Sequence, residues 1–222
     1  MVAGVVALGL VAAGALVVDT VARGEAEDRV AAAVTQRLDV DGTPDVRIEG
    51  FPFLTQLLGR SLRDVDATAS GVTLDGIDLT DVDVRAADVS LEQPYRVGDV
   101  RVEATVPTAS VQRLVQERVA LDVTVDGDVL RATGELLGVP LAVGLVPRVA
   151  AGRLLVDVQD VELGAATLRL DELPGGIADE LTGLEVPLGG LPAGVVLTDA
   201  RVVPDGVRVV AVGTDVVLEA TR

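Results

Sequence analysis

The stretch Gly50-Phe51-Pro52-Phe53-Leu54-Thr55-Gln56-Leu57-Leu58-Gly59-Arg60 guides the interpretation of this chain, because it contains both of its phenylalanines. Tyr95 is the third aromatic residue. Aromatic side chains carry the largest apolar area per residue, and they usually anchor cores, interfaces or membrane contacts. Two interpretations follow. The stretch either packs as a turn and short helix against one end of a sheet, or it forms an exposed apolar site.

On both sides of this stretch, apolar and polar residues alternate with a period of two, which is typical of strands with one buried face. The alternation precedes it at Val46 and Ile48 and resumes at Val65, Ala67 and Ala69. It then continues through most of the chain. We therefore predict many antiparallel strands, each with one face turned toward a core.

Few segments have helical periodicity. Residues 21–38 repeat apolar side chains every four positions, and residues 109–119 form a second apolar stripe after Thr108, a plausible N-cap. Asp-Gly pairs between strand-like runs predict tight hairpin turns, since glycine adopts the positive φ that these turns need. These pairs are at 75–76, 126–127 and 205–206. No linker is visible, so residues 19–222 are predicted to form a single α+β domain.

The N-terminus begins with a long apolar run. Residues 2–18 contain no charged or polar side chain, and Asp19 ends the run. Its length is at the lower edge of the roughly 17 to 25 residues that span a bilayer as a helix. We predict that residues 1–18 form a signal anchor or signal peptide, with a buried helix as the alternative. The following flank lacks a basic excess, which predicts export to the periplasmic side of the plasma membrane.

Composition excludes several kinds of chemistry. The chain has no His, Cys or Trp, and all 18 of its basic residues are Arg. It therefore has no Cys/His zinc site, no Ser-His-Asp triad, no thiolate nucleophile and no P-loop lysine. A net charge of −17 opposes binding to nucleic acid. We predict no catalytic residue, no metal site, no cofactor and no nucleic-acid partner.

Pairs of aspartates two residues apart are the main candidates for acid–base or cation chemistry. Carboxylates at this spacing could bind a divalent cation or act in a glycosidase. On a strand, however, residues two apart simply share one face, and we favour a solvated face. The pairs are Asp39/Asp41, Asp64/Asp66 and Asp81/Asp83.

The apolar faces point instead to binding. A sheet face of Val, Leu and Ala, with few large rings to fill it, could leave an apolar groove. Burying an acyl chain in such a groove contributes about 0.8 kcal/mol per methylene without directional polar contacts.

The residues from Asp45 to Gly59, followed by Leu62-Arg63-Asp64-Val65, resemble the actinobacterial LmeA-like phospholipid-binding family. The segment from Leu191-Pro192 to Val207 adds to the resemblance, which covers most of the chain after residue 18. The resemblance implies an exported, envelope-associated protein that binds phospholipid non-covalently. It also implies a tubular lipid-binding fold, in which a long, curved antiparallel sheet wraps around one or two helices and encloses an apolar cavity.

The aromatic stretch is the candidate lipid-binding site. Leu54, Leu57 and Leu58 fall at helical spacing and share one face, and Pro52 sets the bend into that helix. We predict an apolar lip at a cavity entrance, touching membrane or admitting acyl chains. Two flanking arginines could meet a lipid phosphate. The predicted lipid-binding residues are Phe51, Phe53, Leu54, Leu57, Leu58, Arg47 and Arg60.

Two other functions stay open from sequence. The chain could be a structural or interaction protein of the envelope that supports a membrane enzyme, with a fully packed interior. It could also be a carboxylate-based hydrolase that acts on envelope glycolipid. Lipid transfer, as opposed to binding alone, is a further possibility that the sequence leaves open.

Overall fold

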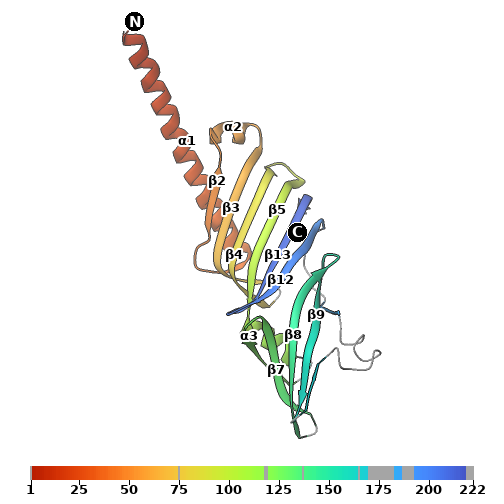
Figure 1. The fold of residues 1–222 in the computed structure, drawn as a ribbon. Coiled ribbons are helices and arrows are strands. Elements are labelled where there is room, and N and C mark those ends of the chain that lie inside the picture. The colour runs from red at the N-terminus through yellow and green to blue at the C-terminus, as the bar shows by residue number, and fades with distance from the viewer. Residues whose placement is uncertain are drawn as a thin grey trace.

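The computed structural model describes residues 2–74, 76–117, 120–136, 138–164, 166–169, 183–186 and 193–218. The molecule is elongated, and helix α1 (Val2–Arg37) projects from one end of it (Figure 1). Two β-sheets follow along the length of the molecule, with helix α3 (Thr108–Gln116) near their junction.

Sheet A contains the longest strands. Its order is β1-β3-β4-β5-β13-β12, with β2 also paired to β3, and every pair is antiparallel. Its strands are β1 (Asp39–Asp41), β2 (Asp45–Glu49), β3 (Ser61–Leu74), β4 (Ile77–Ser90), β5 (Tyr95–Pro107), β12 (Val195–Val203) and β13 (Gly206–Leu218).

Sheet B is formed by the middle of the chain. Its order is β10-β9-β8-β7-β6, with β11 also paired to β9, and these pairs too are antiparallel. Its strands are β6 (Asp122–Asp126), β7 (Val129–Leu136), β8 (Val139–Ala150), β9 (Arg153–Leu163), β10 (Ala166–Arg169) and β11 (Leu184–Val186).

The predicted antiparallel α+β class is confirmed, and the described strands are divided between two open sheets. The tubular wrapping of a sheet around helices stays a prediction. Strand β5 ends at Pro107, which lacks the N–H that a ladder needs, and α3 begins at the next residue. The chain then builds sheet B before β12 and β13 return to sheet A. There β13 pairs with β5 over almost its whole length, and β12 lies beside β8 without joining its ladder.

The helices of the structure include the two segments for which the sequence predicted helical periodicity. The periodicity at residues 21–38 belongs to the C-terminal half of α1, a single helix that runs on from residue 2. Helix α2 (Phe53–Leu58) has Pro52 at its N-cap, where the sequence predicted a bend into the helix. Helix α3 starts one residue before the predicted range. The backbone N–H and hydroxyl of Thr108 donate to the carbonyl of Asp205, so Thr108 ties the helix to the β12–β13 turn rather than capping it.

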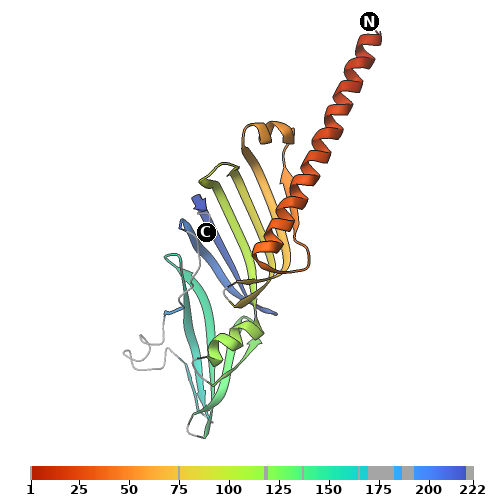
Figure 2. The same ribbon diagram turned by 180° about the vertical axis from the view of Figure 1, so that it is seen from behind.

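Two clusters of buried apolar side chains hold these elements together. The first joins α3 to both sheets through Val123, Leu130, Ala132 and Val207, with Val111 and Val115 of α3 packed against it. The second joins α1 and α2 to β2 and β3. Helix α1 lies against sheet A near β1 and β2 (Figure 2). The clusters therefore lie near the two ends of sheet A, one under α1 and one under α3.

Candidate functional site

One face of sheet A is apolar and turned toward α1. Ile48 of β2 lies opposite Val65 of β3 in the antiparallel register, and Val65 packs against the same buried cluster as Ala22 and Ala26 of α1. Side chains two residues apart lie on the same face of a strand. Through the strand register, the same apolar face therefore continues from Val65 across β4 and β5, away from α1.

The uncovered part of this face is a set of five small or branched apolar side chains, which we call the apolar strip. Ala67 lies opposite Val84, which lies opposite Val102, and Ala86 lies opposite Val100. All five are only partly buried, and none belongs to the two clusters formed by the described residues. The strip is thus an apolar surface that solvent reaches in the middle of the sheet.

The opposite face of sheet A is charged. It forms an open depression of about 650 Å³ lined by residues that include Asp64, Asp66, Arg85, Asp99 and Arg101. Most of these charges have partners: Arg85 lies 3.2 Å from Asp83 and 3.9 Å from Asp66, and Arg101 lies 2.9 Å from Glu103. The Arg101 hydrogen bond lowers the pKa of the Glu103 carboxyl. The depression is open to solvent and carries these ion pairs beside apolar residues such as Ala87 and Val212. The enclosed apolar cavity expected from sequence stays a prediction.

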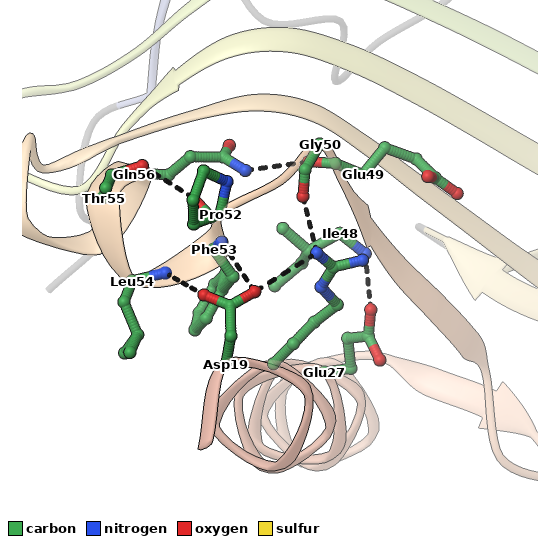
Figure 3. Close-up of polar contacts among 11 residues, drawn as sticks. Asp19, Glu27, Ile48, Glu49, Gly50, Pro52, Phe53, Leu54, Thr55 and Gln56 are labelled. Atoms are coloured by element: carbon green, nitrogen blue, oxygen red, sulfur yellow. Dashed lines mark hydrogen bonds and ion pairs between the residues drawn. The ribbon is translucent and has the colours of Figure 1, made fainter. Parts of the chain in front are cut away.

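A buried carboxylate joins α1 to α2 at the end of the molecule from which α1 projects. Asp19 is only 3% exposed, and its two oxygens accept hydrogen bonds from the backbone N–H groups of Phe53 (3.0 Å) and Leu54 (2.8 Å). Figure 3 shows this side chain pointing from α1 to the start of α2. The hydrogen bond from Leu54, with those from Phe53 and the nearby Arg23 charge, lowers the pKa of Asp19 despite its burial.

Other polar side chains fix the loop that precedes α2. Arg23 donates to the carbonyl of Gly50 at 2.6 Å, and Glu27 accepts the N–H of Ile48 at 2.7 Å (Figure 3). Gln56 is buried and bridges β2 to β3, donating to the carbonyl of Glu49 at 3.0 Å and accepting the N–H of Arg63 at 2.8 Å. We call the assembly of α1 residues 17–27, the loop 50–52 and α2 the α1–α2 corner.

The predicted lip residues are brought together at this corner, but they do not share one environment. Phe53 is 1% exposed and packs in the core with Ile48 and Leu62, while Leu54 is partly buried. Phe51 is 58% exposed, and Leu57 and Leu58 are 46% and 84% exposed. The structure thus places one phenylalanine inside and the other on the surface. Lipid contact by these residues stays a prediction.

The two predicted arginines lie apart from the apolar strip. Arg47 is opposite Asp66 on the charged face, and it pairs with Asp45 at 2.9 Å. Arg60 follows α2 and pairs with Glu92. Contact with a lipid phosphate stays a prediction for both.

Sequence reasoning missed the residues that build the corner. One indication of a role for Asp19 was visible in the sequence, because it is the first charged residue after the apolar run. A charged residue in such a position needs a partner if it is buried. Arg23, Glu27 and Gln56 had no signal of their own, because their partners are backbone groups of another segment.

Within the part of the chain that the structure describes, we find no helix with the length and apolar content needed to cross a membrane. The side chains of residues 2–16 lie outside that part. The predicted anchor at residues 1–18 therefore stays a prediction.

The fold and site define a class: an antiparallel α+β protein whose main sheet has one charged face and one partly uncovered apolar face. Comparison with known families then identifies the family. The model of the LmeA-like phospholipid-binding family matches residues 17–212, and the chain belongs to that family. The resemblance seen in the sequence is thereby confirmed. No curated protein and no solved structure gave a match to the chain.

Proposed function

We propose that this protein binds phospholipid non-covalently in the cell envelope, with the acyl chains of the lipid lying on the apolar strip. Family membership supports phospholipid as the ligand class. One observation supports the apolar strip as the binding site. Its five side chains are partly exposed in the middle of a long sheet: Ala67, Val84, Ala86, Val100 and Val102.

The chemistry of the strip suits an acyl chain. Its side chains offer no hydrogen-bonding group, so they favour a ligand that is itself apolar. Each methylene that leaves water on this surface contributes about 0.8 kcal/mol. Branched and small side chains also leave room for a chain to lie across the strands. We propose binding without catalysis, and transfer of the bound lipid is a further step of the same proposal.

We further propose an exported protein that faces the periplasmic side of the plasma membrane, with residues 1–18 in that membrane. The support is the charge-free run of residues 2–18. In this arrangement the α1–α2 corner lies nearest the membrane, and its exposed residues Phe51, Leu57 and Leu58 lie beside the end of sheet A where a lipid would leave the bilayer.

A matched pair of substitutions tests the location. Val102 and Val212 are both partly buried valines on the adjacent strands β5 and β13, yet they point to opposite faces, since Val102 lies opposite Ala211 and Val212 opposite Arg101. Val102→Asp places a carboxylate in the strip, which opposes an apolar ligand. Val212→Asp places the same carboxylate on the charged face and serves as the control.

The full chain, purified in mild detergent, is compared by mass spectrometry of co-purified phospholipid and by uptake of a fluorescent phospholipid. We expect Val102→Asp to lose both signals and Val212→Asp to keep them, with similar circular dichroism spectra. Equal lipid content in the two variants would overturn the proposed location. Absence of bound phospholipid from the unsubstituted chain would favour an interaction protein, and turnover of glycolipid would favour a hydrolase.

A further inference from the structure

The α1–α2 corner carries a concentration of exposed apolar side chains. On α1, Val17, Val18 and Val21 are exposed on either side of the buried Asp19. On the neighbouring α2 segment, Phe51, Leu57 and Leu58 are exposed as well. Because Asp19 is bonded to the first residues of α2, the two groups of side chains belong to the same end of the molecule. Exposed apolar groups gathered in this way mark an interaction surface.

The position of this surface along α1 indicates its partner. The first N–H groups of α2 are bonded to Asp19, and Asp19 directly follows the charge-free run of residues 2–18. Seventeen helical residues rise about 1.5 Å each, or about 26 Å in all. A bilayer's hydrocarbon core is about 30 Å thick. If residues 2–18 enter a membrane, α2 is therefore held where the hydrocarbon core meets the head groups.

The charges of the segment around α2 suit the same partner. From Gly50 to Arg63 the chain has no acidic residue and two arginines, although the whole chain has a net charge of −17. One of them, Arg60, pairs with Glu92, whereas Arg63 is exposed and forms no ion pair within the described residues. Leucine and phenylalanine beside arginine are typical of segments that lie at the head-group boundary.

We propose that α2 and the adjoining turn of α1 form a docking surface for a phospholipid bilayer. Phe51, Leu57 and Leu58 enter the boundary between head groups and acyl chains, and Asp19 fixes their depth by holding α2 against α1. This inference rests on the membrane location of residues 2–18 in the proposed function, and it adds a second, interfacial contact. Docking at this surface turns the end of sheet A toward the bilayer.

The absence of tryptophan from the chain makes a direct test possible, since one introduced tryptophan is then the only source of tryptophan fluorescence. Leu57→Trp reports on the docking surface. Leu74→Trp is a matched control, because Leu74 is 45% exposed and Leu57 is 46% exposed. Leu74 ends the 14-residue strand β3, which starts just after α2, and that strand is about 45 Å long at about 3.3 Å per residue.

Each variant of the full chain is reconstituted into phosphatidylcholine vesicles with and without brominated acyl chains, which quench tryptophan on contact. We expect Leu57→Trp to show a blue-shifted emission and strong quenching, and Leu74→Trp to show neither. Quenching of Leu57→Trp no greater than that of Leu74→Trp overturns the inference. Leu58→Trp, at an 84% exposed position, provides a second reporter with the same expected result.

The failure of this inference can be told apart from the failure of the proposed function. An unquenched Leu57→Trp that still co-purifies with phospholipid would refute docking and leave binding at the apolar strip intact. A quenched Leu57→Trp, together with full lipid uptake by Val102→Asp, would support docking and refute the strip. A chain that does not stay with the vesicles at all overturns the docking inference together with the proposed anchoring of residues 1–18.

Discussion

Replacing Phe53 by Ala should destabilise the protein far more than replacing Phe51 by Ala, although the two residues have the same side chain and lie two positions apart. Phe53 is 1% exposed and packs with Ile48 and Leu62 beneath Ala22 and Ala26 of α1. Phe51 is 58% exposed on the same loop. The pair therefore separates a core role from a surface role within one short segment.

The size of the effect follows from what surrounds Phe53. Its neighbours belong to α1, β2 and β3, which are tied together by the Asp19 and Gln56 hydrogen bonds, so the site has little freedom to collapse around a smaller side chain. Removing a buried phenylalanine from such a site costs about 3–5 kcal/mol. In a domain of this size that loss corresponds to a melting temperature lower by about 6–20 °C. Phe51→Ala should change the free energy of unfolding by no more than about 0.5 kcal/mol.

The assay is thermal unfolding of the full-length variants in one mild detergent, followed by far-UV circular dichroism. The same samples are tested for quenching by brominated lipid, with Leu57→Trp as the reporter in each background. We expect Phe51→Ala to keep its melting temperature and to weaken the quenching. An equal fall in melting temperature for both variants would refute the assignment of Phe51 to the surface. A stable Phe53→Ala variant would refute the assignment of Phe53 to the core.

Two further predictions concern single positions. The pKa of Asp19 lies below its ordinary value of 3.8, so the stability that this carboxylate contributes is fully present above about pH 4 and is lost as the pH falls through its lower folded value. The difference in melting temperature between the natural chain and Asp19→Asn should therefore be largest at neutral pH and shrink toward pH 3. A difference that stays constant with pH would contradict the stabilisation of the ionised carboxylate by its hydrogen bonds and by Arg23. Gly206→Ala should destabilise by about 1–3 kcal/mol, because a Cβ at φ 153° would lie 2.0 Å from the carbonyl oxygen of Val106. Gly127→Ala, at φ 65° in another Asp-Gly turn with open space around it, should cost less in the same denaturation experiment.

Much of the architecture could be predicted from local pattern. The alternation of apolar and polar residues is enough to assign strands, because side chains on a strand point to opposite faces in turn. It also predicted that Asp64 and Asp66 would share a solvated face, which they do, beside Arg85. Val84 and Val102 lie opposite each other and fall on the other face of the sheet, as the alternation within each strand requires.

The sequence did not predict which strands would pair over long distances. The return of β13 to β5, with the whole of sheet B between them in the chain, depends on contacts between residues about a hundred positions apart. Local propensity carries no information about such partners, since each edge strand offers the same row of backbone groups. The division of the described strands into two sheets was therefore visible only in the tertiary structure.

In the aromatic stretch, too, some features followed from the sequence and others only from the tertiary structure. Its sequence alone indicated an apolar segment with a bend at Pro52 and a helical face formed by Leu54, Leu57 and Leu58. Two residues apart on a strand, Phe51 and Phe53 would share a face, but the chain turns into α2 between them and sends them to opposite environments. Only the tertiary structure decided which of them is buried, because that depends on where α1 lies, and Asp19 holds α1 against α2 across 34 residues of sequence.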